Sequence, residues 1–181
     1  LLYENSSYYS RLTEKDLNLR LKSRFSDLQG INFKKKEFNN SWEDAVFTSN
    51  FDLSVPNYAK IQGNNIIINM IPVNREETSV KKAKARKYDF KIQNGYVNEV
   101  SYMLTLPEGY KLPTLFLPII IKSDFGEYSL QITPKEKNNF EVKRVYKQLP
   151  GTFAKEKYND YVDFRRQIAG YDNTKILLEK L

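Results

Sequence analysis

The chain has 181 residues, a net charge of +7, 40% hydrophobic and 28% charged residues, and neither histidine nor cysteine. The two missing side chains exclude imidazole and thiolate catalysis and the usual zinc ligands, which leaves carboxylate, tyrosine, lysine or arginine chemistry, or none. The length fits one domain with a flanking appendage and needs no disulfides to bury a core. We therefore expect a binding or structural module that is not an enzyme and holds no cofactor or metal.

An N-terminal helix is the first predicted element. Thr13 and Asp16 approximate a capping box, with aspartate in place of the usual glutamate. Apolar residues then recur at spacings of four, four and three, which places them on one helix face: Leu17, Leu21, Phe25 and Leu28. Gly30 is a natural stop after the last turn. Residues 1–11 show no periodicity, so we assign residues 1–30 to a linker and helix.

A series of short strands is predicted between residues 33 and 149. Tyrosine and phenylalanine are abundant there and favour strands, and glycine, proline and asparagine separate the apolar runs. The Asn94-Gly95 pair between two extended runs predicts a hairpin. Alternation of apolar and polar residues indicates half-buried strands. The predicted strands are residues 45–55, 59–62, 66–71, 88–92, 97–106, 128–133 and 140–149.

The chain ends in a predicted helix and strand. Residues 154–170 carry an apolar stripe, Gly170 is the expected terminator, and residues 176–178 read as a final strand. The stripe is formed by Tyr161, Phe164 and Ile168. Because two half-buried sheets must cover each other, residues 31–181 are expected to form a mainly β domain, an antiparallel β-sandwich of jelly-roll or immunoglobulin-like kind, with an N-terminal and a C-terminal helix.

Four segments resemble, in their order and spacing, a known bacterial domain. They are YMLTLPEGY at residues 102–110, FGEY at 125–128, ITP at 132–134 and YVDFRRQIAGYDNTKILLEKL from residue 161. This set resembles the C-terminal β-rich domain of unknown function in Bacteroides-like transglutaminase-like/protease proteins, where it follows a catalytic core. The resemblance covers about residues 13–181.

The resemblance implies a function through the parent protein. The family's catalytic cysteine, histidine and aspartate belong to the upstream core, and this chain has no cysteine or histidine, so no catalytic residue is carried over. It implies a non-catalytic accessory domain that packs on or positions the transglutaminase-like core of the same polypeptide. It also implies a periplasmic or extracellular setting. The chain begins with Leu1, so we expect further residues and any signal peptide upstream.

Aromatic residues supply an alternative function, a carbohydrate or cell-surface binding module. Exposed rings can stack on sugars, and the candidate binding residues are Trp42, Tyr58, Tyr88 and Tyr96. Packing in the core or at its rim is the competing interpretation, which we prefer. A carboxylate-dependent hydrolase is a third alternative, from Glu43-Asp44 or Glu76-Glu77. We rank it last, because neighbours on one strand point to opposite faces and cannot flank a substrate together.

Two basic runs account for much of the net charge, Lys34–Lys36 and Lys81–Lys87. Such runs can bind nucleic acid or anionic lipid, but no nucleic-acid-binding motif accompanies them, so we expect solvated loops or edge strands and no nucleic-acid partner. The longest apolar run, Leu115–Ile121, is seven residues and contains a proline. This is the size of a buried strand, so no membrane span is expected in this chain.

Overall fold

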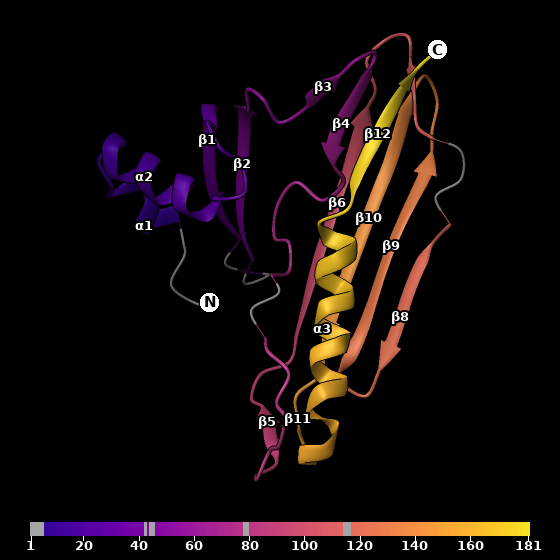
Figure 1. Cartoon of the computed structure of the whole chain (residues 1–181). Helices are drawn as coiled ribbons and strands as arrows, with labels where there is room; N and C mark the ends of the chain where they lie inside the picture. Colours follow the sequence, from indigo (N-terminus) through magenta and orange to yellow (C-terminus); the bar gives the residue numbers. More distant parts are fainter. Residues whose placement is uncertain (1–5, 42, 44–45, 78–79, 114–116) are drawn as a thin grey trace. The chain divides into compact units, whose positions relative to one another are not determined.

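The structure is a computed structural model, shown in Figure 1, and it describes residues 6–41, 43, 46–77, 80–113 and 117–181. The chain forms two compact units, Leu1–Ala59 and Lys60–Leu181. The sequence placed the domain boundary after residue 30 instead. The two differ because the first long strand pair folds onto the N-terminal helices, as described next.

The first unit consists of two helices and a hairpin. The elements are α1 (Ser6–Ser10), α2 (Glu14–Arg24), β1 (Asn32–Ser41) and β2 (Val46–Ser54). The predicted cap of α2 is present, since the Thr13 hydroxyl accepts from the Asp16 N–H at 3.1 Å and donates to its carboxylate at 2.7 Å. The helix ends earlier than predicted, at Arg24, and Gly30, at φ +74°, lies in a later turn.

Aromatic rings join the helices of this unit to its hairpin. The Tyr9 ring, 1% exposed, stacks on Phe38 at 4.3 Å and on Phe47 at 5.7 Å. Phe25, just after α2, packs edge-on against Phe51 at 5.4 Å. The residues before position 12 were predicted to be a linker, but α1 brings Tyr9 into this cluster. This prediction was wrong because a short helix without periodicity takes its stability from packing and leaves little pattern in the sequence.

The second unit is mainly β, with antiparallel strand pairs throughout its described residues, as predicted. Its elements are β3 (Lys60–Gln62), β4 (Asn65–Asn69), β5 (Phe90–Ile92), β6 (Tyr96–Thr105), β7 (Tyr110–Lys111), β8 (Ile119–Ser123), β9 (Gly126–Pro134), β10 (Asn139–Gln148), β11 (Gly151–Phe153), the 3-10 helix η1 (Lys155–Lys157), α3 (Tyr158–Asp172) and β12 (Lys175–Lys180).

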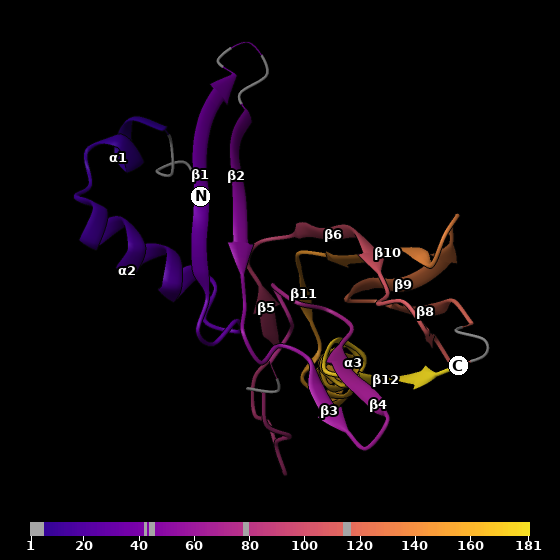
Figure 2. The same cartoon turned by 90° about the horizontal axis from the view of Figure 1, so that it is seen from above.

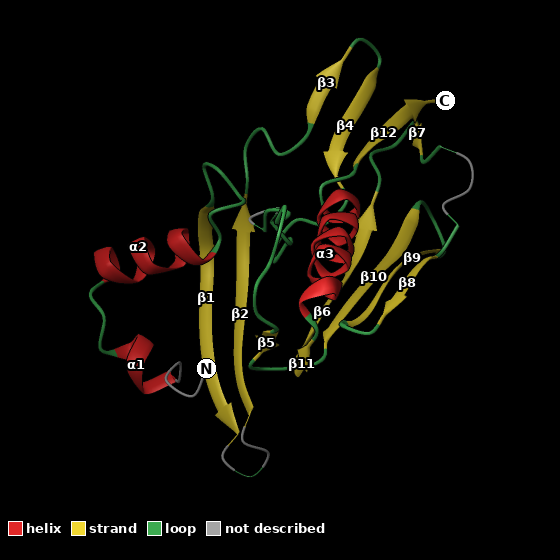
Figure 3. Ribbon diagram, turned by 60° about the horizontal axis from the view of Figure 1, so that its bottom comes forward, coloured by secondary structure: helices red, strands yellow, loops and turns green. Residues whose placement is uncertain are grey.

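The main sheet has the strand order β6-β10-β9-β8, and α3 lies along one of its faces (Figures 1 and 3). Side chains alternate across it: Val142, Arg144 and Tyr146 of β10 are buried, whereas Lys143 and Lys147 are exposed. A second sheet has the order β3-β4-β12-β7, and β11 pairs with β5. Antiparallel sheets with few helices are thus confirmed. The jelly-roll or immunoglobulin-like sandwich stays a prediction.

Glycine and asparagine mark turns between paired strands at two places in the structure, and fail to do so at a third. The Gly63-Asn64 turn joins β3 to β4, with Gly63 at φ +60°, and Asn138, at φ +58°, lies in the β9–β10 turn. The hairpin predicted at Asn94-Gly95 is wrong, because β5 pairs with β11 and β6 with β10. A glycine is needed there for another reason: a Cβ at Gly95 would lie 2.6 Å from the Pro150 ring. The sequence pattern assigned Gly95 to a turn, whereas the structure requires glycine there because the chain at Pro150 passes too close for a side chain.

The C-terminal elements match the prediction except at their ends. Phe164 and Ile168 are buried on α3. Strand β12 pairs with β4, beside which it lies in Figure 2, and on its other side with β7, labelled in Figure 3. The helix begins at Tyr158 and runs to Asp172, so Gly170 does not end it. Asn173 caps the helix, donating its backbone N–H to the Ala169 carbonyl at 3.1 Å. Of the described helices, none is long and apolar enough to cross a membrane.

Gly170 gives a direct test of the helix end. It is exposed, and a Cβ added there would meet nothing within 4 Å. Because glycine within a helix is destabilising by about 0.8–1 kcal/mol relative to alanine, Gly170→Ala should raise the free energy of unfolding by about that amount. Urea denaturation followed by circular dichroism measures it. If Gly170 were the terminator predicted from sequence, in a left-handed conformation, the substitution would be destabilising instead.

Candidate functional site

The four candidate binding residues do not form one site. Trp42 lies outside the described residues. Tyr58 belongs to the first unit and is half-buried, whereas Tyr88 and Tyr96 belong to the second. Tyr88 is 80% exposed. Tyr96 is engaged in packing, since its ring lies edge-on to Tyr146 at 5.4 Å and its hydroxyl donates to the Glu76 carboxylate at 3.2 Å.

A buried ion pair connects the C-terminal end of α3 to the main sheet. Arg144 of β10 and Asp172 of α3 are both 0% exposed, and Arg144 Nη2 donates to Asp172 Oδ2 at 2.6 Å. The Asp172 carboxylate also accepts from the Tyr128 hydroxyl and the Glu76 backbone N–H, each at 2.8 Å. Arg144 donates to Asn98 at 3.1 Å. Every charge in this cluster is paired, as burial requires, so the arrangement is structural.

A second polar cluster lies beside it. The Glu76 carboxylate pairs with Arg165 of α3, and Arg165 Nη1 donates to the Tyr161 hydroxyl at 3.0 Å. Glu76 was one of the carboxylates considered for a hydrolase. It is engaged in this ion pair, whereas its neighbour Glu77 is exposed. Of the other pair, Glu43 is exposed and Asp44 lies outside the described residues. The structure therefore brings together no two carboxylates facing across a cleft among the described members of these pairs.

The buried phenols of these clusters are held in the neutral form. Burial, reinforced by Asp172, raises the pKa of Tyr128, and burial raises the pKa of Tyr146. Burial and the Glu76 charge raise the pKa of Tyr96. A phenol with a raised pKa is a poor nucleophile or base at neutral pH, so the three tyrosines serve packing and hydrogen bonding.

These shifts predict a loss of stability in alkaline solution. A group whose pKa is higher in the folded state contributes stability below its unfolded pKa, near 10 for tyrosine, and loses it as pH rises further. The melting temperature should therefore fall above about pH 10, and Tyr128→Phe should make that fall shallower. Thermal denaturation across this range measures both. A variant curve parallel to the wild-type curve would contradict the assignment to Tyr128.

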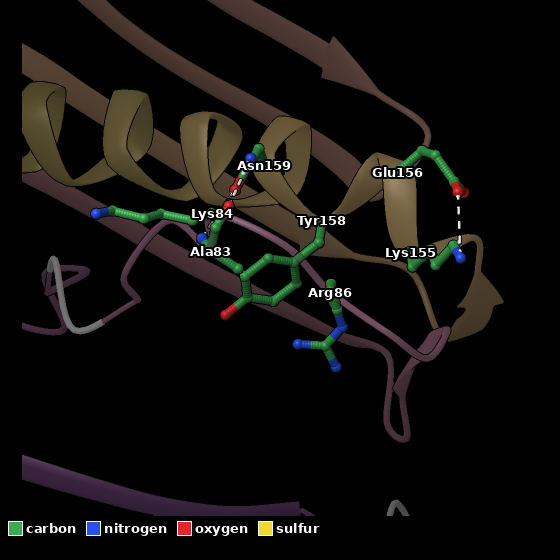
Figure 4. A pocket seen from close by; sticks show the side chains of 7 residues that line it. All are labelled: Ala83, Lys84, Arg86, Lys155, Glu156, Tyr158 and Asn159. Carbon is green, nitrogen blue, oxygen red and sulfur yellow. Dashed lines mark hydrogen bonds and ion pairs between the residues drawn. The ribbon is translucent and has the colours of Figure 1, made fainter.

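The basic run at residues 81–87 lies along α3 and forms no strand. Lys82 pairs with Asp163 at 2.7 Å. The backbone N–H and C=O of Ala83 bond the Asn159 side chain, each at 3.1 Å, as Figure 4 shows. Since Asp163 and Asn159 are four residues apart, they share one face of the helix. The expectation of a solvated loop at residues 81–87 is confirmed, and the structure shows that this loop is hydrogen-bonded and ion-paired to α3.

A small pocket opens where this run meets the start of the helix. Its volume is about 170 Å³, and its lining residues are shown in Figure 4: Ala83, Lys84, Arg86, Lys155, Glu156, Tyr158 and Asn159. The Arg86 guanidinium lies over the Tyr158 ring, 4.3 Å from its centroid, and its Nε donates to the Tyr88 carbonyl at 3.0 Å. Three cationic side chains around one hollow make this pocket the candidate binding site of the second unit.

Sequence reasoning missed Arg144, Asp172 and Arg165. One signal was available: Arg144 occupies an inward position between Val142 and Tyr146, and a charge among buried positions of an alternating strand indicates a buried partner. Its partner, 28 residues away at the end of a helix, could not be identified from spacing. Within the part of the chain that the structure describes, no cluster of three or more acidic side chains could hold a metal ion.

Comparison with known proteins connects this architecture to a family. A family described as a domain of unknown function with a solved structure, DUF3858, matches residues 64–178. A crystal structure described as a "putative protease" from Parabacteroides distasonis matches with a TM-score of 0.55 and 25% identity over 66% of this chain. The chain spans only 24% of that protein's length. No curated protein matched. The family match covers most of the second unit, and the chain therefore belongs to the DUF3858 family.

Proposed function

We propose that this chain is a non-catalytic accessory domain of a longer protein, which packs on or positions a transglutaminase-like catalytic core. The observation that carries the proposal is the match of 66% of this chain to 24% of a larger structure described as a "putative protease". We infer that a domain matching a quarter of such a protein acts through contact with the remainder. The proposal includes the C-terminal position, the sandwich arrangement and the periplasmic or extracellular setting expected from the family resemblance.

The side chains of the second unit support a non-catalytic role. The chain has no histidine or cysteine for a thiolate–imidazole pair. Its buried carboxylate Asp172 and its nearly buried Glu76 are paired with Arg144 and Arg165. Paired groups of this kind hold the helix on the sheet and have no open position for a substrate.

Hydrogen exchange of the parent protein tests the accessory role. Amides of this domain should exchange more slowly in the full-length protein than in the isolated chain, at one contiguous surface. The isolated chain should show no hydrolysis of peptides and no transglutaminase activity. Identical exchange in both forms would refute docking. Turnover by the isolated chain that a single substitution abolishes would refute the non-catalytic assignment.

A second candidate is a carbohydrate or cell-surface binding module, favoured by the 80% exposure of Tyr88. An exposed ring on a loop can stack on a sugar. Co-sedimentation of the chain with insoluble polysaccharides tests this. Tyr88→Ala should abolish sedimentation, whereas Tyr171→Ala, a change at a 38% exposed ring, should not. Equal sedimentation of both variants would exclude Tyr88 as the contact.

A further inference from the structure

The pocket at the start of α3 has a charge that its lining residues do not neutralise. Lys84, Arg86 and Lys155 contribute three positive charges, and Glu156 is the one acid among the described lining residues. Lys155 is 3.9 Å from Glu156, at the limit of an ion pair. The positive end of the helix α3 lies close by and adds to the same potential. The net charge of the lining residues is thus two positive, which suits a dianion.

Arg86 is already held in a conformation suited to an anion. Its guanidinium is stacked on Tyr158, with the Phe90 ring 5.6 Å away, and its Nε is bonded to the Tyr88 carbonyl. Among the described residues, no acceptor pairs with its terminal nitrogens Nη1 and Nη2. These two nitrogens form the fork that binds two oxygens of one oxyanion. Because the Arg86 side chain is already held by its contacts within the fold, binding an anion costs it little further conformational entropy.

Lys84 and Lys155 add two positive charges to the pocket, and both are exposed side chains. Lys84 extends to the opposite side of the Tyr158 ring from Arg86 in Figure 4. Each can turn toward a ligand on Arg86, Lys155 by leaving its 3.9 Å contact with Glu156. The cavity, about 170 Å³, is more than tenfold the ~10–15 Å³ that one water needs. It has room for a tetrahedral oxyanion and its first substituent.

We propose that this pocket binds the phosphate of a phosphomonoester, with the Arg86 fork as its principal contact and Lys84 and Lys155 as supporting charges. A phosphomonoester carries close to two negative charges at neutral pH, which matches the pocket, whereas a carboxylate carries one. This inference does not rest on the accessory role, since it is argued from the lining residues of the pocket alone.

Titration with glycerol 3-phosphate at constant ionic strength, followed by amide NMR shifts, tests the proposal. We expect saturable shifts at residues 83–86 and 155–159. Arg86→Ala should weaken binding about tenfold, the effect of losing one charged hydrogen-bonded contact. Arg86→Lys should also weaken it, because lysine lacks the fork. The matched control Arg166→Ala removes an exposed arginine elsewhere on α3 and should leave binding unchanged.

The pH dependence supplies a readout that a nonspecific charge effect would not give. The chain has no histidine, the side chain that ordinarily titrates between pH 5 and 8. The carboxylates near the site are Glu156, in the lining, and Asp89, which accepts from the Lys155 backbone N–H at 3.1 Å. Affinity should therefore fall below about pH 6 as the ester itself loses its second charge. Methyl sulfate, a monoanion throughout, should bind more weakly and without this dependence.

Two further arms identify the source of the phosphate. Inorganic phosphate should compete with the ester. Vesicles containing phosphatidic acid that bind more tightly than glycerol 3-phosphate would assign the ligand to a lipid headgroup, and equal or weaker binding would assign it to a soluble ester. Shifts that do not saturate, or an equal loss of affinity in the Arg86 and Arg166 variants, would overturn the proposal.

Discussion

Replacing Asp172 by alanine should lower the free energy of unfolding by about 3–5 kcal/mol, the usual effect of removing one partner from a buried ion pair. The loss is large because Arg144, 0% exposed, would be left charged and without its partner. The Tyr128 hydroxyl and the Glu76 N–H would lose their acceptor as well. Urea denaturation followed by circular dichroism measures the change.

The matched control is Asp163→Ala on the same helix. Asp163 pairs with Lys82 at 2.7 Å, but its side chain is 45% exposed. An exposed ion pair contributes about 0–1 kcal/mol, so this variant should be close to wild type. The double variant Arg144→Met/Asp172→Leu should regain part of the loss, because it removes the unpaired charge and fills the volume. If Asp172→Ala and Asp163→Ala lowered the free energy of unfolding equally, the buried pair would contribute no more stability than the exposed one.

Phe164→Ala should lower the free energy of unfolding by a similar amount, about 3–5 kcal/mol. Phe164 is 4% exposed and lies between the helix and the sheet, with ring centroids of Phe125 and Tyr146 at 6.2 and 6.1 Å. Truncating it removes apolar burial and leaves a cavity that rigid neighbours cannot fill. Thermal and urea denaturation of the purified variant measure the loss.

Exposed positions on the same unit provide the comparison for Phe164. Tyr88→Ala removes an equally large ring at an 80% exposed position and should change stability by no more than about 0.5 kcal/mol. If Phe164→Ala cost less than about 1 kcal/mol, well under the usual range for a buried phenylalanine, α3 would be peripheral to the fold.

Elements with a strong local pattern were predicted from the sequence. Thr13 and Asp16 place the start of α2, and the stripe at Phe164 and Ile168 identifies the buried face of α3. The alternation along β6 and β9 shows which side chains face inward. Each of these signals lies within about ten residues, so spacing alone carries it.

The sequence-based predictions that were wrong concern features that depend on contacts between segments far apart in the chain. Asn94-Gly95 has the composition of a hairpin turn, yet β5 pairs with β11 about 60 residues later in the chain. The end of α3 is decided at Asp172, which Arg144 and Tyr128 hold from the sheet, two residues beyond the glycine that local preference selected. The candidate site was missed for the same reason, since Arg86 and Tyr158 meet only when residues 81–87 lie along the helix.

The sequence by itself determined the class of protein: a mainly β, antiparallel chain without the side chains for thiolate or imidazole chemistry. Composition and short-range periodicity carry that information, because burial of one face of each strand and helix is imposed residue by residue. Only the tertiary structure decided which charges are paired and which are free. Burial forces Arg144 and Asp172 together, while Arg86, stacked on Tyr158 at the surface, keeps its fork for a ligand.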